Sequence, residues 1–215
     1  MRCCFSLLLF ILIGNLGGGC GQKAPQPLTA DEIKILIEKV KAAPLLDVAD
    51  DEVAVIETDL GRLVLEFYPN VAPNHCRNFK RLADNGFYDG TKFHRVVPDF
   101  VIQGGDVLSR DADPGNDGTG DPGYTLPAEF SNTPHKRGIL SMARKGYSVD
   151  TAGSQFFICV GPAHQLNGQY TVFGRVIEGM EVADKIVAAA SPHQTDMPAN
   201  PVVMNKVKVM KRNEL

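Results

Sequence analysis

The sequence predicts a mainly β domain: a closed antiparallel barrel with an α-helix capping each end. Two observations carry this prediction. Between residues 51 and 212, seven or eight short β-rich segments are separated by turn residues, and only two segments show helical spacing. A doubly wound sheet would need a helix after nearly every strand. Closure into a barrel removes the edges that an antiparallel sheet would otherwise expose.

The strands are indicated by alternation of apolar and polar residues. Segments 52–58 and 62–68 flank the turn 59–61 and predict a hairpin with one buried face. Leu63, Leu65 and Phe67 alternate there with Arg62, Glu66 and Tyr68. The remaining strands are expected at 92–97, 100–103, 139–143, 155–160, 170–176 and 202–211.

Two helices are expected inside the domain. In segment 72–85, Pro73 fits a first helical turn, apolar residues follow at three- to four-residue spacing, and Gly86 supplies the residue after the helix. Cys76 lies on this apolar stripe and is expected to be a small core residue. Segment 179–189 carries Met180 and Ile186 at the same kind of spacing.

The first fifty residues predict a targeting signal followed by a linker. After Arg2, the apolar run 5–16 fits a secretory signal and is shorter than a membrane span. Small residues before Cys20 resemble a bacterial lipoprotein signal, although Gly17 stands where Leu is usual. We therefore expect a signal peptide over 1–19 and a lipidated Cys20 as the mature N-terminus, with an ordinary secretory signal as the alternative. The protein would then be exported to the cell envelope and touch the membrane only through this anchor.

Segment 20–50 is expected to be a linker with one short helix. Pro25 and Pro27 favour an extended chain. Thr29 and Glu32 form a capping-box pattern ahead of apolar residues at helical spacing, which predicts a helix over 30–42. We expect this helix to be a spacer that packs lightly on the domain, which spans 51–212.

Composition and short motifs exclude several functions. The net charge is −3, with 22 basic and 25 acidic residues, which argues against a nucleic-acid partner. No C-x-x-C, G-x-S-x-G, Walker or H-E-x-x-H motif occurs, so a zinc ribbon, a thioredoxin-type site, a hydrolase and an NTPase have no support. No metal or cofactor is expected. The Asp-rich loop 106–123 fails as an EF-hand because Tyr124 stands where a Glu ligand is needed. A calcium-stabilised interaction domain on this loop is a weaker hypothesis. His75, His135, His164 and His193 are scattered and expected at the surface.

Four motifs carry the functional signal. They are F-H-R-V-V-P-D-F-V-I-Q-G-G-D at 93–106, G-I-L-S-M-A at 138–143, G-S-Q-F-F-I at 153–158 and L-N-G-Q-Y-T-V-F-G-R-V at 166–176. Together, and in this order, they closely resemble the cyclophilins, the peptidyl-prolyl cis-trans isomerases. The resemblance covers about residues 52–211. It implies an eight-stranded antiparallel barrel, two capping helices, and a groove on the outer face that binds proline-containing polypeptides.

The resemblance also implies roles for individual residues. Arg95 matches the catalytic arginine, and Gln103 matches the glutamine that orients the arginine and the substrate. The hydrophobic proline pocket is matched by Phe100, Val101, Phe157 and Leu166. The positions that bind the residue before proline are matched by Ala143, Arg144 and Gln155. Members with this single-domain layout are usually monomers, and a monomer is expected.

Two positions depart from the family pattern. Gln165 stands where many members have a groove Trp, and Tyr170 stands where a groove His is common, although its hydroxyl can still donate. These departures motivate a second hypothesis, a non-catalytic module that binds proline-containing peptides. The leading hypothesis remains an isomerase that assists the folding of exported proteins.

Overall fold

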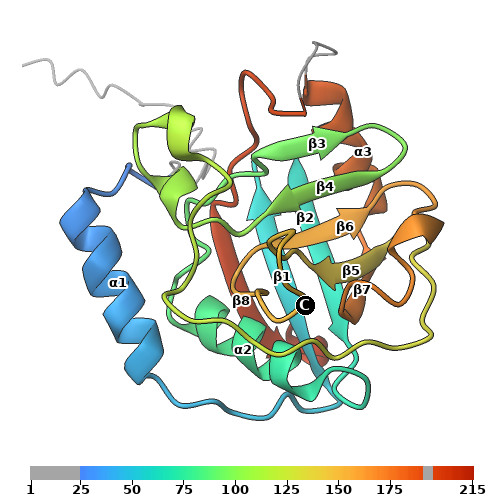
Figure 1. The fold of residues 1–215 in the computed structure, drawn as a ribbon. Coiled ribbons are helices and arrows are strands. Elements are labelled where there is room, and N and C mark those ends of the chain that lie inside the picture. The colour runs from blue at the N-terminus through green and yellow to red at the C-terminus, as the bar shows by residue number, and fades with distance from the viewer. Residues whose placement is uncertain (1–24, 191–195) are drawn as a thin grey trace, which may run out of the picture.

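The computed structural model describes residues 25–190 and 196–215, which form eight strands and three α-helices (Figure 1). The helices are α1 (Ala30–Ala42), α2 (Pro73–Asp84) and α3 (Met180–Ala189). The strands are β1 (Glu52–Thr58), β2 (Gly61–Phe67), β3 (Arg95–Val97), β4 (Val101–Gly104), β5 (Ile139–Met142), β6 (Phe156–Cys159), β7 (Val172–Glu178) and β8 (Lys206–Lys211). The predicted signal peptide 1–19 and Cys20 lie outside the described residues.

All strand pairs are antiparallel, in the order β3-β4-β6-β5-β7-β2-β1-β8. The sheet curls into a half-barrel, with α2 across its lower end and α3 at its upper end in Figure 1. The eight antiparallel strands and the capping helices match the prediction, but the expected closure does not, because the ladder ends at β3 and β8.

The gap between β3 and β8 is covered by the chain that precedes β8. The N–H of Phe93 donates to Val202 O at 2.9 Å, and the N–H of Val96 donates to Asp196 O at 2.8 Å. This covering segment contains Pro198 and Pro201, which have no N–H to donate to a ladder. It therefore hides the edge of β3 without becoming a ninth partner in the sheet, and β3 is shorter than the predicted strand 92–97.

Helix α2 ends as its sequence predicts and fills the centre of the core. Gly86 has φ of +72°, and its N–H donates to Ala83 O while that of Phe87 donates to Leu82 O. These two bonds form a Schellman motif, which needs a left-handed residue after the helix. Phe79 is fully buried and contacts four other aromatic rings, with centroid separations of 4.8 to 5.7 Å.

Helix α1 packs more closely on the domain than its expected role as a light spacer requires. The capping box of Thr29 and Glu32 is present, and the helix spans the predicted residues 30–42. Ile33 and Val40 are buried in the same core cluster as the sheet. The two side chains lie seven residues apart on one stripe, which explains why one face of the helix stays against the domain.

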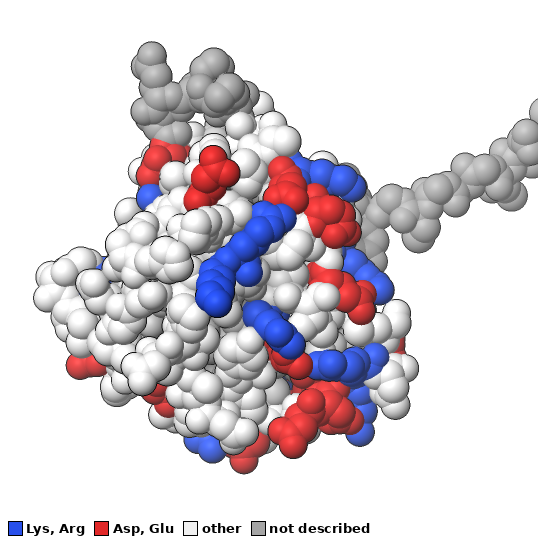
Figure 2. Space-filling view, turned by 90° about the vertical axis from the view of Figure 1, so that its right-hand side faces the viewer, with Lys and Arg blue, Asp and Glu red and all other residues white. Residues whose placement is uncertain are grey.

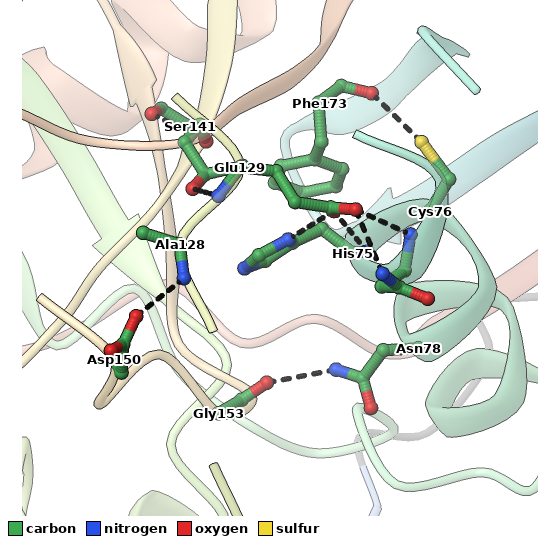
Figure 3. Close-up of polar contacts among 11 residues, drawn as sticks. His75, Cys76, Asn78, Ala128, Glu129, Ser141, Asp150, Gly153 and Phe173 are labelled. Atoms are coloured by element: carbon green, nitrogen blue, oxygen red, sulfur yellow. Dashed lines mark hydrogen bonds and ion pairs between the residues drawn. The ribbon is translucent and has the colours of Figure 1, made fainter. Parts of the chain in front are cut away.

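The N-terminus of α2 is capped by a distant carboxylate rather than by its own N-cap residue, Ala72. Glu129 accepts from the N–H groups of Asn74 and His75, and its Oε2 lies 2.6 Å from His75 Nδ1 (Figure 3). An anion there satisfies free N–H groups and complements the helix dipole. His75 and His135 are both fully buried, so the expectation that they lie at the surface is wrong.

The buried pair His75–Glu129 has shifted acidities. Burial lowers the pKa of His75, and the neighbouring Glu129 only partly offsets this effect. Burial also opposes ionisation of Glu129, but hydrogen bonds from His75 and from the backbone outweigh it and lower the pKa of Glu129. A neutral His75 that donates from Nδ1 to an ionised Glu129 fits both shifts.

Charged side chains of opposite sign lie among one another on the face shown in Figure 2. Ion pairs on the described surface include Arg137–Asp184 at 2.7 Å and Arg175–Glu66 at 2.8 Å. A nucleic-acid interface typically gathers Lys and Arg on one face, and the described residues of this face do not. None of the helices in the described part of the chain has the length and apolar character needed to span a membrane.

Both cysteines in the described residues are free and buried. Cys76 lies on α2 and donates from Sγ to Phe173 O, which confirms its place in the core. Cys159 lies on β6 at full burial. Burial raises the pKa of each thiol to about 12.

Candidate active site

The strands that build the candidate site are apolar on both faces. On β4 and β6, Ile102 and Phe156 belong to the core that packs on α2. Their neighbours Val101, Phe157 and Cys159 point to the opposite, outer face and form a second apolar cluster. Successive side chains of a strand alternate between faces, so continuous apolar runs here feed two separate clusters. The second cluster forms the floor of the site.

Strand register brings three of the predicted site residues into one row. Arg95 on β3 is paired with Gln103 on β4, and Gln103 is paired with Phe157 on β6. Directly paired residues project to the same face, with Cβ atoms about 4.5–5.5 Å apart. A cation, an amide and an aromatic ring therefore lie side by side across three neighbouring strands.

This row opens into a pocket of about 280 Å³. Residues from five segments between positions 95 and 170 line it. The lining residues are Arg95, Phe100, Val101, Gln103, Ala143, Arg144, Phe157, Leu166 and Tyr170. Nine of the ten predicted catalytic and substrate-binding residues thus meet at one hollow, which no side chain of residues 25–190 or 196–215 fills.

The tenth residue, Gln155, supports the pocket from behind Gln103. Its Oε1 accepts from Gln103 Nε2 at 3.0 Å, while its Nε2 donates to the carbonyl oxygens of Gly118 and Gly120 at 3.0 and 2.9 Å. Gln155 also lines an adjoining hollow of about 190 Å³, which shares Gln103, Ala143 and Arg144 with the first. Among the described residues, Gln103 Oε1 has no hydrogen-bond partner, so this acceptor is left for a ligand.

Phe157 is held in place by rings on two sides. His135 stacks on it at a centroid separation of 5.9 Å, and Tyr170 meets it edge to face at 5.7 Å. His135 is itself fixed by Ser141 Oγ, 3.1 Å from its Nε2. Burial lowers the pKa of His135, which favours the neutral form of the ring beside the apolar floor.

Comparison with known proteins decides the family. The family described as cyclophilin type peptidyl-prolyl cis-trans isomerase/CLD matches residues 53–209. The chain belongs to the cyclophilin-type peptidyl-prolyl cis-trans isomerases.

Relatives and solved structures agree with this membership. Peptidyl-prolyl cis-trans isomerase B of Bacillus subtilis is 49% identical over 127 residues, which is 58% of this chain and 82% of the relative. A peptidyl-prolyl cis-trans isomerase of Synechococcus elongatus is 43% identical over 143 residues, 63% of this chain and 92% of the relative. A cyclophilin of Cryptosporidium parvum, crystallised in the presence of the dipeptide Ala-Pro, superposes with a TM-score of 0.67 at 31% identity, covering 74% of this chain and 99% of that one.

In this cyclophilin, the two positions that depart from the family pattern have local partners. The Arg144 guanidinium lies over the Tyr170 ring, 4.7 Å from its centroid, and Arg144 Nε donates to Gln169 O. Gln165 lies in the short 3-10 helix His164–Leu166, and its carbonyl oxygen accepts from Gln169 Nε2. Arg144 and Tyr170 therefore form one wall of the pocket, while Gln165 is not among the lining residues.

The sequence did not predict the charged residues that form ion pairs with side chains lining the two hollows of this cyclophilin. Asp196 contacts Arg95, and Lys145 pairs with Asp121 at 3.1 Å beside the adjoining hollow. These partners lie 24 to 101 residues apart in the chain. No motif or periodicity links residues at such separations, and only the folded register of the loops does.

The Asp-rich loop of this cyclophilin uses its carboxylates for turns. Asp113 Oδ1 accepts from the Gly115 N–H, Asp121 Oδ1 from the Gly123 N–H, and Asp106 from Gly118. The bonds of Asp113 and Asp121 span two residues and are typical of Asx turns, whereas the Asp106 bond spans twelve residues and joins two parts of the loop. Among the described residues, no three His, Cys, Asp or Glu side chains gather as a metal site would require.

Proposed function

We propose that this cyclophilin isomerises Xaa–Pro peptide bonds at the 280 Å³ pocket, with Arg95 and Gln103 acting on the reacting amide. The observation that supports the proposal is the row of Arg95, Gln103 and Phe157 across β3, β4 and β6. It puts hydrogen-bonding groups and an apolar ring side by side on one open face.

The reaction requires no bond to break. Resonance in the peptide bond creates a barrier of about 18–20 kcal/mol to rotation. A catalyst must therefore bind the twisted amide more tightly than either planar form. In the twisted amide the proline nitrogen regains its lone pair, and a permanently charged guanidinium can donate a hydrogen bond to it.

The charged and the apolar groups of the pocket have different roles: one donates a hydrogen bond, and the other holds the proline ring. A hydrogen bond to a charged group contributes about 1.5–3 kcal/mol, which corresponds to about 10- to 100-fold in rate. Val101, Phe157 and Leu166 form an apolar slot that can hold the proline ring while the preceding carbonyl turns. The Ala-Pro dipeptide present with the Cryptosporidium parvum cyclophilin supports a proline-containing polypeptide as the ligand.

An exchange experiment tests this assignment. Isomerisation of an Ala-Pro-containing tetrapeptide is measured by NMR exchange spectroscopy for wild type, Arg95→Ala and the control Arg175→Ala. Arg175 is an exposed arginine on β7 that pairs with Glu66 away from the pocket. We expect a loss of at least about 10-fold in kcat/KM for Arg95→Ala alone. Equal rates for Arg95→Ala and wild type would refute the role of Arg95. Tight peptide binding by wild type without exchange would instead favour the non-catalytic binding module.

We also propose that the protein works on exported polypeptides from a lipid anchor at Cys20. The support is the sequence alone: a short apolar run over 5–16 that ends in small residues before Cys20. Mass spectrometry of the mature N-terminus tests it. A lipid-modified Cys20, lost in Cys20→Ala, is expected; an unmodified N-terminus at another residue would contradict the anchor and favour an ordinary secretory signal.

A further inference from the structure

One carboxylate holds the Arg95 guanidinium by its outer side. Asp196 Oδ2 accepts from Nε at 3.1 Å and from Nη2 at 2.8 Å. Two donors on one acceptor fix both the direction and the plane of a guanidinium, because its N–H groups form a rigid fork. Arg95 has 34% of its side chain exposed, so packing alone does not hold it.

Asp196 is itself anchored independently of its side chain. Its carbonyl oxygen accepts from the Val96 N–H at 2.8 Å, next to Arg95 on the edge strand β3. This backbone bond satisfies an edge group that would otherwise be free. A change of the Asp196 side chain therefore leaves the covering segment attached to β3.

The remaining donors of Arg95 are free for a ligand. Among the described residues, Nη1 makes no hydrogen bond, and Arg95 lines the pocket beside Phe100 and Gln103. An arginine side chain carries substantial rotamer entropy. A guanidinium that is already oriented loses less of this freedom when the twisted amide forms than one that must be ordered at that moment.

We propose that Asp196 is a positioning residue of the isomerase, which orients the Arg95 guanidinium toward the reacting amide. The inference rests on the proposed role of Arg95. The apolar slot binds the proline ring whether or not Arg95 is oriented. Loss of the Asp196 carboxylate therefore raises the free energy of the transition state but not that of the bound substrate. It lowers kcat while KM stays near its wild-type value.

The first test compares two exposed aspartates. Asp184 is a matched control: its side chain is 55% exposed, as is that of Asp196, and it pairs with Arg137, which does not line the pocket. In Asp196→Ala we expect kcat to fall by about 3- to 10-fold with KM within about 2-fold of wild type. Asp196→Glu, which keeps the carboxylate, should recover part of the loss. Asp184→Ala should match wild type, and all three variants should keep the melting temperature.

The second test separates positioning from a general effect of charge. In an Arg95→Lys background the forked donor is absent, so adding Asp196→Ala should change kcat no further. The NMR signal of the Arg95 Nε–H should exchange slowly with water in wild type and faster in Asp196→Ala. An Asp196→Ala enzyme with wild-type or higher kcat, or an unchanged Nε–H signal, would overturn the proposal. An inactive wild type would instead count against the proposed function, and the Nε–H measurement would still decide whether Asp196 holds Arg95.

Discussion

The two faces of β4 and β6 carry similar apolar residues, but one face is closed by the core and the other borders an open pocket. On the core face, Phe156 is fully buried and contacts the rings of Phe79 and Tyr88. On the outer face, its neighbour Phe157 is 4% exposed and borders an open pocket. Composition alone does not distinguish the two positions, since both are phenylalanines in one strand.

The difference lies in what covers each face. Helix α2 closes the core face with six buried residues along its stripe. On the outer face, the described loops that carry Ala143, Arg144, Leu166 and Tyr170 line the pocket but leave it open. The apolar area of this open pocket becomes fully buried only when a ligand enters it. Burial on the core face stabilises the fold, whereas apolar area on the outer face remains available to bind a ligand.

The largest expected effect comes from truncating the two phenylalanines separately. Phe156→Ala should lower the free energy of unfolding by about 3–5 kcal/mol, because it leaves a cavity in a closed aromatic cluster. Phe157→Ala should cost less, about 1–3 kcal/mol, because its site is open on one side. Urea unfolding measures both.

Activity should rank the same two variants in the opposite order. We expect Phe157→Ala to lose at least about 10-fold in kcat/KM for an Ala-Pro peptide, since it loses much of the proline slot. Phe156→Ala, assayed where it remains folded, should retain most of the wild-type value. Equal losses of stability and of activity in the two variants would contradict a division of labour between the faces.

A smaller effect is expected from pH, which should change the stability of the fold but not the isomerase rate of the folded enzyme. The pKa of His75 is lowered from 6.5 by burial, so its contribution to stability is complete above about pH 6.5 and decreases as the pH falls toward the folded-state value. Protonation then favours the unfolded chain. Between about pH 8 and about pH 5, unfolding free energy should fall, with a shallower slope in His75→Asn. The isomerase rate of the folded enzyme should hold over that range, because a guanidinium does not titrate there.

The smallest effect is expected at the wall of the pocket. Arg144 lies over the Tyr170 ring on an exposed surface, where a cation–π contact is worth about 0.5–1 kcal/mol. Arg144→Ala should therefore lower kcat/KM by about 2- to 5-fold and leave the melting temperature unchanged. Arg62→Ala, which removes a surface arginine paired with Glu178, serves as the control. A fall in melting temperature without a change in rate would place Arg144 in the scaffold instead.

Local pattern predicted most of the fold. Strand 52–58 and helix 30–42 lie at the predicted residues, and α2 begins and ends within one residue of the expected 72–85. These elements depend on alternation, caps and Gly86, all of which act within a few residues. The closed barrel was not predictable in this way, because closure depends on whether the segment before β8 pairs with β3.

In the candidate site too, residues within motifs were predicted, and residues fixed by contacts distant in sequence were missed. The resemblance of four motifs identified nine residues that the folded strands bring to one pocket. The burial of His75 was missed because its partner, Glu129, lies 54 residues away in a loop. A histidine on a helix reads as a surface residue until the loop that covers it is known. Asp196 was missed for the same reason, since no rule of spacing connects it with Arg95.

The burial of both cysteines has a consequence for contacts between this enzyme and other thiol-containing chains. A folding polypeptide with unpaired cysteines or unsettled disulfides exchanges them with any thiolate it meets. Cys76 and Cys159, buried and with pKa values of about 12, are almost entirely protonated at neutral pH. Burial and protonation therefore both disfavour mixed disulfides between these two side chains and another chain.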